Sequence, residues 1–255
     1  MTRRVVKSLL ILLPTLNEEG GLSKIATRIP IENLREHGWN PSILVVDGDS
    51  KDKTKQIAIE NRFKLIQQAG KGKGAALRSG FKYALSQKFD ALVMLDADAT
   101  YDPGDIIKLV AKLGKFDVVI GDRLNGELKD ESMGVVNFFG NHALSWIART
   151  LFSEDIGDLC TGYWAFTKKA LSTLELNSMS FEIEAEMFCS STKNGLRIGS
   201  VPISYSKREG EAKLGSLTDG GRILRKLLVR RLFPTPAESK INNDKLALGS
   251  DNESQ

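Results

Sequence analysis

The stretch of residues 91–100 constrains the fold of this chain more than any other part of its sequence. Residues 91–95 are all apolar, which is typical of a buried strand, and two carboxylates, Asp96 and Asp98, follow them one residue apart. The Tyr-Asp-Pro-Gly sequence at 101–104 then predicts a bend and the start of a helix. Because open α/β sheets bind ligands at the carboxyl ends of their strands, we expect both carboxylates to lie at such an edge.

Two carboxylates at a strand end can bind a metal ion. Residues two apart on a strand lie roughly 6.5 Å apart on one face, so both can reach one ion only where the backbone bends. Hard oxygen ligands with vacant positions suit Mg²⁺ or Mn²⁺ holding a diphosphate, so we predict that Asp96 and Asp98 bind one of these metals. An apolar run followed by Asp-x-Asp-x-Thr also fits phosphatases that use an aspartate nucleophile, and such aspartates can simply solvate a loop.

Apolar segments alternate with amphipathic ones through the first half of the chain. This alternation predicts strands joined by helices, and so parallel strands with right-handed crossovers. We therefore expect an α/β fold, with a mostly parallel central sheet flanked by helices and a nucleotide-binding half over residues 1–121. The predicted strands are residues 8–15, 43–46, 64–67, 91–96 and 116–120, and the predicted helices are residues 22–29, residues 52–61 and a long helix that begins at 70–74.

The loops after these strands should meet at one edge of the sheet. Asp47 could accept the imino hydrogen of a base, which uracil and guanine both offer, and Glu18 could bind ribose hydroxyls. Lys71 and Lys73, with the N–H groups at a helix start, could hold phosphate oxygens. Their glycine-rich stretch is not a Walker A loop, because Gly-x-x-x-x-Gly-Lys-Ser/Thr does not occur there. The four loops are residues 14–19, 47–50, 70–74 and 96–100.

The second half of the chain has a different pattern. Residues 125–134 are polar and predict a mobile loop, whereas residues 137–152 predict a helix with more large apolar side chains than one buried stripe needs. That helix can be a core helix, or it can face a membrane in part. Further predicted elements are strands at 162–166 and 197–205 and a helix at 181–194.

Residues 218–233 predict a basic amphipathic helix. A helical projection puts its leucines and Ile223 on one half and four cations on the other. Such a helix suits an anionic membrane surface, and it equally suits a solvated position on the domain. The four cations are Arg222, Arg225, Lys226 and Arg230.

Length and composition limit the organisation of the chain. A chain of 255 residues with 41% hydrophobic residues can bury one sizeable core, so we expect one domain over 1–233, divided into 1–121, 122–217 and 218–233, and a disordered tail over 234–255. Two cysteines are too few for a disulfide framework and no signal peptide opens the chain, so we expect a cytoplasmic location. No apolar run approaches the ~20 residues that cross a bilayer, so membrane contact should be peripheral. A net charge of +4 does not favour nucleic acid as a partner.

Four motifs give the sequence a family resemblance. They are Leu-Pro-Thr-Leu-Asn-Glu-Glu at 13–19, Val-Val-Asp-Gly-Asp-Ser at 45–50, Gly-Lys-Gly at 72–74 and Asp-Ala-Asp at 96–98. In this order and spacing, the chain resembles the inverting nucleotide-sugar glycosyltransferases of family 2, which have a GT-A fold. Stretches at 121–123, 158–163, 181–187 and 201–215 resemble its dolichyl-phosphate mannose synthase-like subgroup of dolichyl- or polyprenyl-phosphate hexosyltransferases. The resemblance covers roughly residues 8–233.

This resemblance implies transfer of a hexose from a UDP- or GDP-linked sugar to a dolichyl or polyprenyl phosphate, on the cytoplasmic face of a membrane. It also implies Mg²⁺ or Mn²⁺ at Asp96 and Asp98. The family often has Asp-Gly-Ser where Asp-Gly-Asp-Ser stands at 47–50, and mannosyl members usually carry other residues at 99–100, so the sugar stays open. The residues that would contact the nucleotide sugar are Pro14, Leu16, Glu18, Asp47, Lys71, Lys73 and Asp96.

A lipid phosphate acceptor sets the chemistry that the remaining candidates must perform. Because this phosphate is already anionic, its oxygen can attack the anomeric carbon without a strong general base. Asp98 and the metal would stabilise charge on the departing diphosphate. Cations must hold the acceptor phosphate, and the candidates for this role are Arg123, Arg208 and Lys213.

Three glutamates near the start of the predicted helix at 181–194 are further candidates. Glu182 and Glu186 share a face while Glu184 points elsewhere, and we expect one of them to contact the sugar, with Glu182 as the catalytic candidate. A transferase acting on a soluble or saccharide acceptor would need a carboxylate base, which Glu182 or Glu186 could supply. A phosphatase would leave the loops after the first two strands unexplained.

Overall fold

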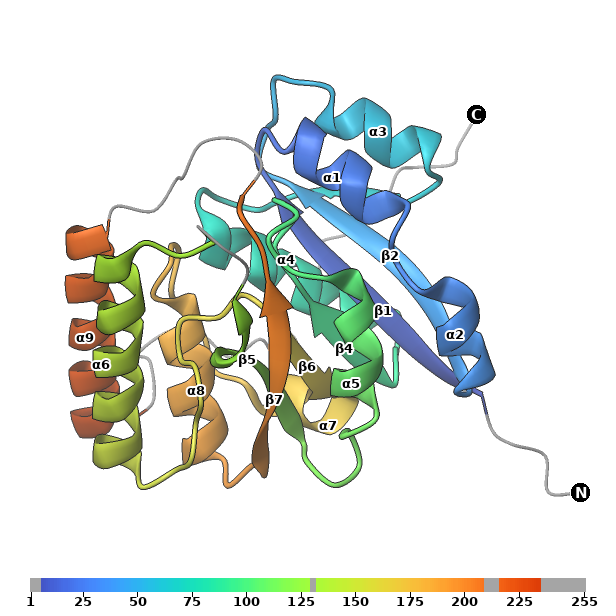
Figure 1. The fold of residues 1–255 in the computed structure, drawn as a ribbon. Coiled ribbons are helices and arrows are strands. Elements are labelled where there is room, and N and C mark those ends of the chain that lie inside the picture. The colour runs from blue at the N-terminus through green and yellow to red at the C-terminus, as the bar shows by residue number, and fades with distance from the viewer. Residues whose placement is uncertain (1–5, 129–131, 209–215, 235–255) are drawn as a thin grey trace, which may run out of the picture.

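A computed structural model describes residues 6–128, 132–208 and 216–234 (Figure 1). Strands and helices alternate in it, as the sequence predicts. The strands are β1 (Lys7–Thr15), β2 (Trp39–Asp47), β3 (Lys64–Gln67), β4 (Ala91–Met94), β5 (Val118–Leu128), β6 (Trp164–Thr167) and β7 (Ile198–Tyr205). The helices are α1 (Glu19–Ala26), α2 (Ile31–Glu36), α3 (Thr54–Glu60), α4 (Lys73–Ser86), the short 3₁₀ helix η1 (Pro103–Asp105), α5 (Ile106–Val110), α6 (Val135–Phe152), α7 (Lys168–Thr173), α8 (Ile183–Lys193) and α9 (Ser216–Leu232).

A seven-stranded sheet has the order β3-β2-β1-β4-β6-β5-β7. β1 pairs in parallel with β2 and β4, and β2 pairs in parallel with β3, so the carboxyl ends of these four strands lie at one edge. β5 and β7 are also parallel, whereas β6 runs antiparallel to β4 and β5. The predicted mostly parallel α/β sheet is therefore confirmed. The direction of β6 was not predicted, because it depends on which strands become its neighbours in space.

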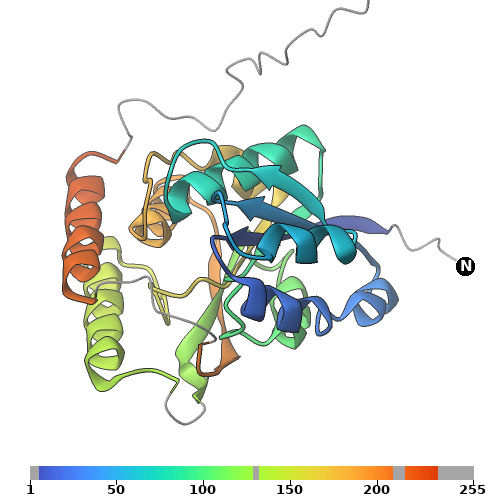
Figure 2. The ribbon, with the colours of Figure 1, turned by 90° about the horizontal axis from the view of Figure 1, so that it is seen from above.

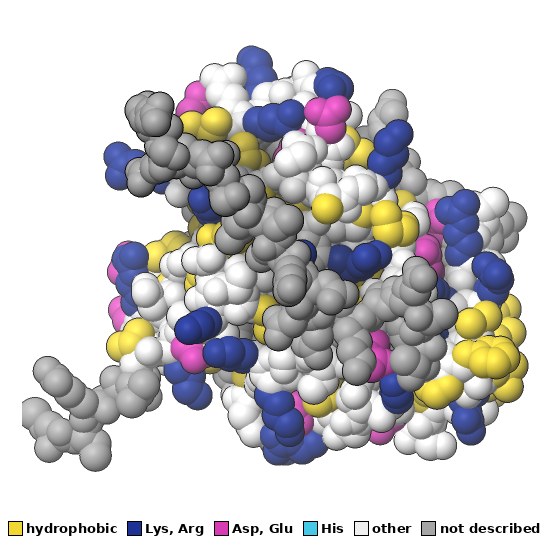
Figure 3. Space-filling model, turned by 180° about the vertical axis from the view of Figure 1, so that it is seen from behind, with side chains coloured by type: hydrophobic (Ala, Val, Ile, Leu, Met, Phe, Trp, Pro, Cys, Tyr) yellow, Lys and Arg dark blue, Asp and Glu magenta, His cyan; other side chains and the backbone are white. Residues whose placement is uncertain are grey.

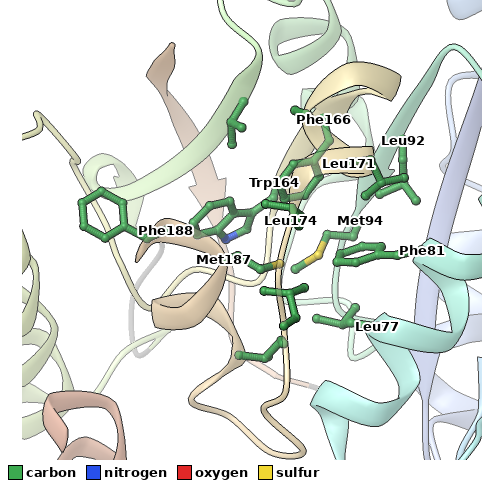
Figure 4. Packing of buried hydrophobic residues seen from close by; sticks show 14 of the residues in the cluster. Leu77, Phe81, Leu92, Met94, Trp164, Phe166, Leu171, Leu174, Met187 and Phe188 are labelled. Atoms are coloured by element: carbon green, nitrogen blue, oxygen red, sulfur yellow. The ribbon is translucent and has the colours of Figure 1, made fainter. Parts of the chain in front are cut away.

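Helices cover both faces of the sheet and bury a separate apolar cluster on each (Figures 1 and 2). α1, α2, α3 and α5 cover one face, and α4, α7 and α8 cover the other, with α6 and α9 next to α8. On this second face Trp164 stacks on Phe166 at 5.9 Å, and Phe81 of α4 meets Phe166 edge-on at 5.7 Å (Figure 4). Burial of each such side chain contributes about 1.5–3 kcal/mol, so these layers hold the sheet edge in a defined position.

β5 extends further than the sequence predicts. The strand continues to Leu128, so the mobile loop predicted for residues 125–134 is wrong over residues 125–128. This part of β5 pairs with β7 after a register shift, which brings Glu127 opposite Ser204. A polar strand of this kind looks like a loop in the sequence, because strand formation depends on pairing with a partner that is distant along the chain.

α6 and α9 lie side by side at one end of the sheet (Figures 1 and 2). α6 buries Ser145 and Ala148 on its inner side. Val136, Phe139 and Trp146 on the same helix are exposed, so α6 is in part a core helix and in part a surface helix. Within the described residues, no helix combines the length and apolar character needed to cross a membrane.

The faces of α9 differ from the predicted pattern. Ile223 and Leu227 are buried, but Arg230 is buried as well, and Lys226 contacts Glu186 of α8 at 3.3 Å. The prediction that the four cations share a solvated face is therefore wrong for Lys226 and Arg230. The physical reason is the buried carboxylate on α8, which attracts both cations inward.

Candidate active site

A pocket of about 500 Å³ opens at the carboxyl edge of β1, β2, β3 and β4. Its walls come from the loops after these strands, from the start of α4, from the segment before α8 and from the segment after β7. The predicted site residues that line it are Pro14, Leu16, Glu18, Lys71, Lys73, Asp96, Asp98 and Arg208. Its other lining residues are Thr15, Gly48, Asp49, Gln67, Gln68, Gly70, Gly72, Ala76, Ala97, Ser180 and Phe181.

Three of the loops contain a residue in the left-handed backbone region, namely Asn17 (φ 51°), Asp49 (φ 74°) and Ala99 (φ 61°). Such conformations cost about 1–3 kcal/mol each in non-glycine residues and persist where surrounding contacts hold them. The N–H of Asn17 donates to Ser50 Oγ at 2.9 Å, and the N–H of Asp49 donates to Asp47 Oδ2 at 2.9 Å. Strained loops held in this way are typical of ligand sites.

The carboxylates of the pocket are paired with cations. Lys73 Nζ lies 2.6 Å from Asp96 Oδ1 and 2.7 Å from Glu184 Oε1. The guanidinium of Arg208 lies 2.8 Å from Glu18 Oε1 and 3.1 Å from Asp98 Oδ2. Two cations thus link three carboxylates of the loops after β1 and β4 and one carboxylate of α8.

Arg208 reaches the strand ends because β7 ends beside the Asp96–Asp98 loop. The N–H of Ser206 donates to the carbonyl oxygen of Thr100 at 2.8 Å, and Tyr205 forms a β-bridge with Tyr101. The chain continues from this anchored point to Arg208. More than 100 residues therefore separate two groups that are ion-paired in the fold.

Burial shifts the pKa values of the groups around Lys73. Burial opposes the charge on Lys73, but Asp96 and Glu184 outweigh it and hold the pKa of Lys73 above its ordinary value. Burial, with a smaller contribution from Asp96, raises the pKa of Glu184, although Lys73 opposes the rise. Ligands that bring negative charge would meet a fully charged lysine here.

Asp96 and Asp98 fit a hard divalent cation by the chemistry of their donor atoms. Both are carboxylates at one strand end, and each already faces a positive group, Lys73 or Arg208. Asp98 is oriented by its own loop, since its Oδ1 accepts the N–H of Thr100 at 3.1 Å and the Thr100 hydroxyl at 2.6 Å. The described residues contain no cluster of three or more acidic, histidine or cysteine ligands, so water or substrate oxygens would complete the coordination of a metal held by Asp96 and Asp98.

The glycine-rich loop packs against protein rather than lying open for phosphate. Gly74 N–H donates to the carbonyl oxygen of Met179 at 3.1 Å. A Cβ on Gly72 would lie 2.2 Å from Met179 O, and one on Gly74 would lie 2.4 Å from Ser178 O. These glycines therefore allow close contact with the segment before α8, and the loop offers Lys71 and Lys73 to the pocket.

Asp47 and Arg123 lie outside the lining that the described residues form. Asp47 is buried in its own turn, where its carboxylate accepts the N–H groups of Asp49 and Ser50. Arg123 is buried in an ion pair with Asp158 at 2.6 Å, and its guanidinium lies over the ring of Tyr205. Lys213, the remaining predicted cation, lies outside the described residues.

The three glutamates have three different environments. Glu184, which helical spacing places apart from the other two, is the one that contacts Lys73. Glu186 is buried against Arg230 of α9 and is not among the pocket-lining residues, which does not favour its suggested use as a base toward an acceptor. Glu182 precedes α8 and has a buried Oε2 without a hydrogen-bond partner in the described part of the chain. Local helical spacing could not distinguish them, since their partners come from α4 and α9.

The fold and the pocket define a class of protein, an α/β protein with a pocket lined by paired charges at the carboxyl edge of its sheet. More narrowly, the chain belongs to glycosyl transferase family 2, whose family model matches residues 10–174. This confirms the predicted family.

Individual relatives extend the likeness along the chain. The low-salt glycan biosynthesis hexosyltransferase Agl6 of Haloferax volcanii is 33% identical over 91% of this chain and 56% of its own length, so this chain spans about half of that relative. The dolichyl-phosphate hexose transferase of the same organism is 29% identical over 88% of this chain and 93% of its own length.

A solved structure supports the fold. The glucosyl-3-phosphoglycerate synthase of Mycobacterium tuberculosis, in a complex with phosphoglyceric acid, superimposes with a TM-score of 0.68 and 20% identity. The match covers 90% of this chain and 81% of that one. At this level of identity the likeness concerns the fold, and it agrees with the predicted GT-A architecture.

Proposed function

We propose that this protein is an inverting hexosyltransferase that moves a hexose from a nucleotide-diphosphate sugar to a dolichyl or polyprenyl phosphate. The observation that carries the proposal is the set of charges in the pocket, where Lys73 and Arg208 face Asp96 and Asp98 at the carboxyl edge of the sheet. A similar chain is named a dolichyl-phosphate hexose transferase, and another an undecaprenyl-phosphate mannosyltransferase. These names support a lipid phosphate as the acceptor class.

The donor would lie across the strand ends. Pro14, Leu16 and Glu18 would contact the nucleoside, with the loop that Asp47 holds in its turn forming the base end of the pocket. Lys71 and Lys73 would face the diphosphate. Mg²⁺ or Mn²⁺ bound at Asp96 and Asp98 would neutralise charge on the departing diphosphate. Solved structures of the mycobacterial synthase hold Mn²⁺ and UDP, which supports a divalent metal of this kind.

The acceptor phosphate needs cations rather than a base. An oxygen of the acceptor phosphate forms a bond to the anomeric carbon while the bond between that carbon and the diphosphate oxygen breaks. The electron pair of the broken bond leaves with the diphosphate. Arg208 is suited to hold the acceptor, since its Nε is buried without a hydrogen-bond partner in the described residues. Arg123 and Lys213 remain proposed contributors, Arg123 through its buried pair with Asp158.

A sugar hydroxyl would meet Glu182. Its buried Oε2 has no hydrogen-bond partner among the described residues, and it follows the pocket-lining Ser180 and Phe181 in the chain. Buried acceptors are almost always satisfied in folded proteins, so an unsatisfied one next to a pocket suits a ligand hydroxyl.

A membrane surface is the proposed partner of α6 and α9, on the cytoplasmic side. Exposed apolar side chains of both helices gather at one edge of the molecule, together with lysine and arginine side chains (Figure 3). A lipid acceptor keeps its tail in the bilayer and its phosphate at the headgroups, so a peripheral enzyme must present its pocket there. The exposed apolar residues are Val135, Val136, Phe139, Trp146, Leu228, Val229, Leu232 and Phe233.

One alternative has an observation in its favour. Burial raises the pKa of Glu184, which lies beside Lys73, and a carboxylate with a raised pKa can exchange a proton with a hydroxyl acceptor. The same pocket could then transfer a sugar to a saccharide. The two functions differ in the acceptor and in the need for a carboxylate base, and a comparison of acceptors separates them.

The test is transfer of labelled hexose from UDP- and GDP-linked donors in the presence of Mg²⁺ or Mn²⁺. Polyprenyl phosphate is supplied in one series and soluble saccharides in another, and products are separated by organic extraction. We expect label in the organic phase, and its loss when EDTA is added. Label that enters only the aqueous saccharide would support the alternative, and transfer to neither acceptor would contradict both.

A further inference from the structure

A buried ion cluster connects α8 with α9 away from the pocket lining. Glu186 Oε1 accepts hydrogen bonds from Arg230 Nε at 3.1 Å and Lys226 Nζ at 3.3 Å, and it also pairs with Arg230 Nη2. Glu186 is fully buried and Arg230 is 5% exposed. Although burial opposes ionisation, Arg230 and Lys226 hold the pKa of Glu186 below its ordinary value. Glu186 is therefore ionised at neutral pH.

The same cluster holds the segment of residues 177–181. Glu186 Oε2 accepts the backbone N–H groups of Asn177 at 2.8 Å and Ser178 at 2.7 Å. The side-chain oxygen of Asn177 accepts hydrogen bonds from Arg230 at 3.0 Å and Lys226 at 3.1 Å. One end of the segment is thus fixed by groups from two helices.

The opposite side of this segment forms a wall of the pocket. Met179 O accepts the N–H of Gly74, and the segment ends in Ser180 and Phe181, which line the pocket. Lys73 Nζ lies 5.9 Å from the centre of the Phe181 ring. A displacement of residues 177–181 would therefore move the glycine-rich loop and the lysine that faces Asp96.

We propose that Glu186 and Arg230 are positioning residues of the active site. Their buried pair holds residues 177–181 against the glycine-rich loop and so sets the position of Lys73, although no described residue of α9 lines the pocket. The reading of the pocket as the donor site rests on the proposed function, whereas the mechanical link between α9 and α4 does not.

The link can be measured without any substrate. Arg230→Met keeps an unbranched apolar stem like that of arginine while it removes the charge and the donors. Hydrogen exchange followed by mass spectrometry should show faster exchange in the peptide that covers residues 70–80, although the described hydrogen bonds and ion pairs of Arg230 go to Glu186 and Asn177 and not to this peptide. Arg231→Met is the matched control, because Arg231 lies next on α9 and donates to the carbonyl oxygen of Leu151 on α6 at 2.9 Å.

Conservative variants separate positioning from general loss of stability. Arg230→Lys keeps the charge but loses the bidentate geometry of the guanidinium. Its exchange rate over residues 70–80 should therefore lie between those of wild type and Arg230→Met. If Arg230→Met does not fold, hydrogen exchange over residues 70–80 is compared with wild type in Arg230→Lys and Glu186→Gln instead. Unchanged exchange over residues 70–80 in folded variants of both residues would overturn the proposal.

The effect on catalysis follows from misplacement of Lys73. A shift of about 1 Å in a binding group can cost about 100-fold in rate, so kcat/KM should fall by this order in Arg230→Met at a matched fraction of folded protein. Gly74→Ala displaces the same segment from its other side, because the added Cβ would lie 2.4 Å from the carbonyl oxygen of Ser178. The fold-loss of kcat/KM in the double variant of Arg230→Met with Gly74→Ala should be smaller than the product of the two single fold-losses, since both substitutions act through one segment. If the fold-loss of kcat/KM in the double variant equalled that product, the two substitutions would not act through one shared segment.

Failure of the proposed function has a different signature. If wild type transfers hexose to no lipid phosphate, the kinetic comparison is made with whichever acceptor accepts label, and the hydrogen-exchange result stands by itself. Faster exchange over residues 70–80 in Arg230→Met together with unchanged kcat/KM would show a mechanical link that does not position the site, and would overturn the proposal as stated.

Discussion

At the scale of single residues, the pocket is a set of opposed charges that a ligand must rearrange. Arg208 lies between Glu18 and Asp98, and Lys73 lies between Asp96 and Glu184. Pairing of this kind satisfies buried charges that would otherwise be costly. A donor with a diphosphate and a metal ion brings both signs of charge, so it can replace these partners without leaving a buried charge alone.

The two aspartates after β4 should be needed for transfer but unequal for stability. Asp96→Ala and Asp98→Ala should each lower kcat by about 100-fold or more, because charge on the departing diphosphate is no longer neutralised. Asp98→Ala should also lower the midpoint of thermal unfolding further than Asp96→Ala, since Asp98 holds Thr100 through two hydrogen bonds. Asp155→Ala, at an exposed carboxylate, is the control. Near-wild-type transfer in both variants in the presence of EDTA would contradict the metal site.

Glu184 should make stability depend on pH. Burial raises its pKa above the ordinary value of 4.5, so in the window above 4.5 the folded state holds a proton that the unfolded state has lost. The contribution of Glu184 to the free energy of unfolding is therefore fully present below about pH 4.5 and is lost as the pH rises through the raised pKa. Glu184→Gln removes this fall. Urea unfolding from about pH 4 to about pH 7 should show the variant gaining stability relative to wild type as pH rises. A constant difference would contradict the raised pKa.

At the scale of elements, close packing between α1 and the Asp96–Asp98 loop sets the geometry of the sheet edge that carries these two aspartates. Gly21 of α1 is buried, and a Cβ there would lie 2.2 Å from the carbonyl oxygen of Ala97 and 2.7 Å from the Cα of Asp98. Its neighbour Gly20 has no atom within 4 Å of such a Cβ among the described residues. The helix therefore contains one glycine required by packing and one that is not.

Two alanine substitutions one residue apart in α1 should have opposite effects. Gly20→Ala should stabilise the protein by up to about 1 kcal/mol, because alanine has the higher helix propensity and the site is open. Gly21→Ala should destabilise it and lower transfer, because the backbone of the Asp96–Asp98 loop must shift. Thermal unfolding and the hexose-transfer assay test both. If Gly21→Ala were as stable and as active as Gly20→Ala, this loop would not depend on contact with α1.

At the scale of the whole molecule, the proposed function requires the pocket and the exposed apolar edge to serve one substrate. α6 and α9 form that edge at one end of the sheet, and the cluster of Glu186, Lys226 and Arg230 ties α9 to the domain (Figure 1). The cations left on the surface of α9 include Arg222 and Arg225. Membrane contact should therefore depend on these two rather than on Lys226.

Flotation with anionic vesicles should carry the protein upward at low salt and release part of it at high salt. Each Lys or Arg near an anionic surface contributes about 1 kcal/mol, so Arg222→Glu with Arg225→Glu should weaken binding by more than about tenfold. Lys112→Glu with Lys115→Glu makes the same charge change at exposed positions after α5 and is the control. Equal loss in both double variants would mean that net charge, and not the edge formed by α6 and α9, governs binding. Protein that stayed soluble with anionic vesicles at low salt would favour a soluble acceptor.

The sequence by itself determined the α/β architecture and most of the pocket edge. Apolar runs such as residues 91–95 must be buried, and the chain leaves a parallel strand at its carboxyl end, so Asp96, Asp98 and Lys73 were found from local pattern alone. The division of residues 1–233 into parts and the disordered tail remain predictions, since residues 235–255 lie outside the described structure.

The tertiary structure alone decided which charges meet. Helical spacing grouped Glu182 with Glu186, but α4 brings Lys73 to Glu184 and α9 brings Arg230 to Glu186. In the packed fold, the polar stretch 125–128 is also part of strand β5, and Lys226 is turned toward Glu186. The physical reason is that periodicity reports which face of an element is buried, whereas the partner of a buried charge comes from a distant segment that only the packed fold brings near.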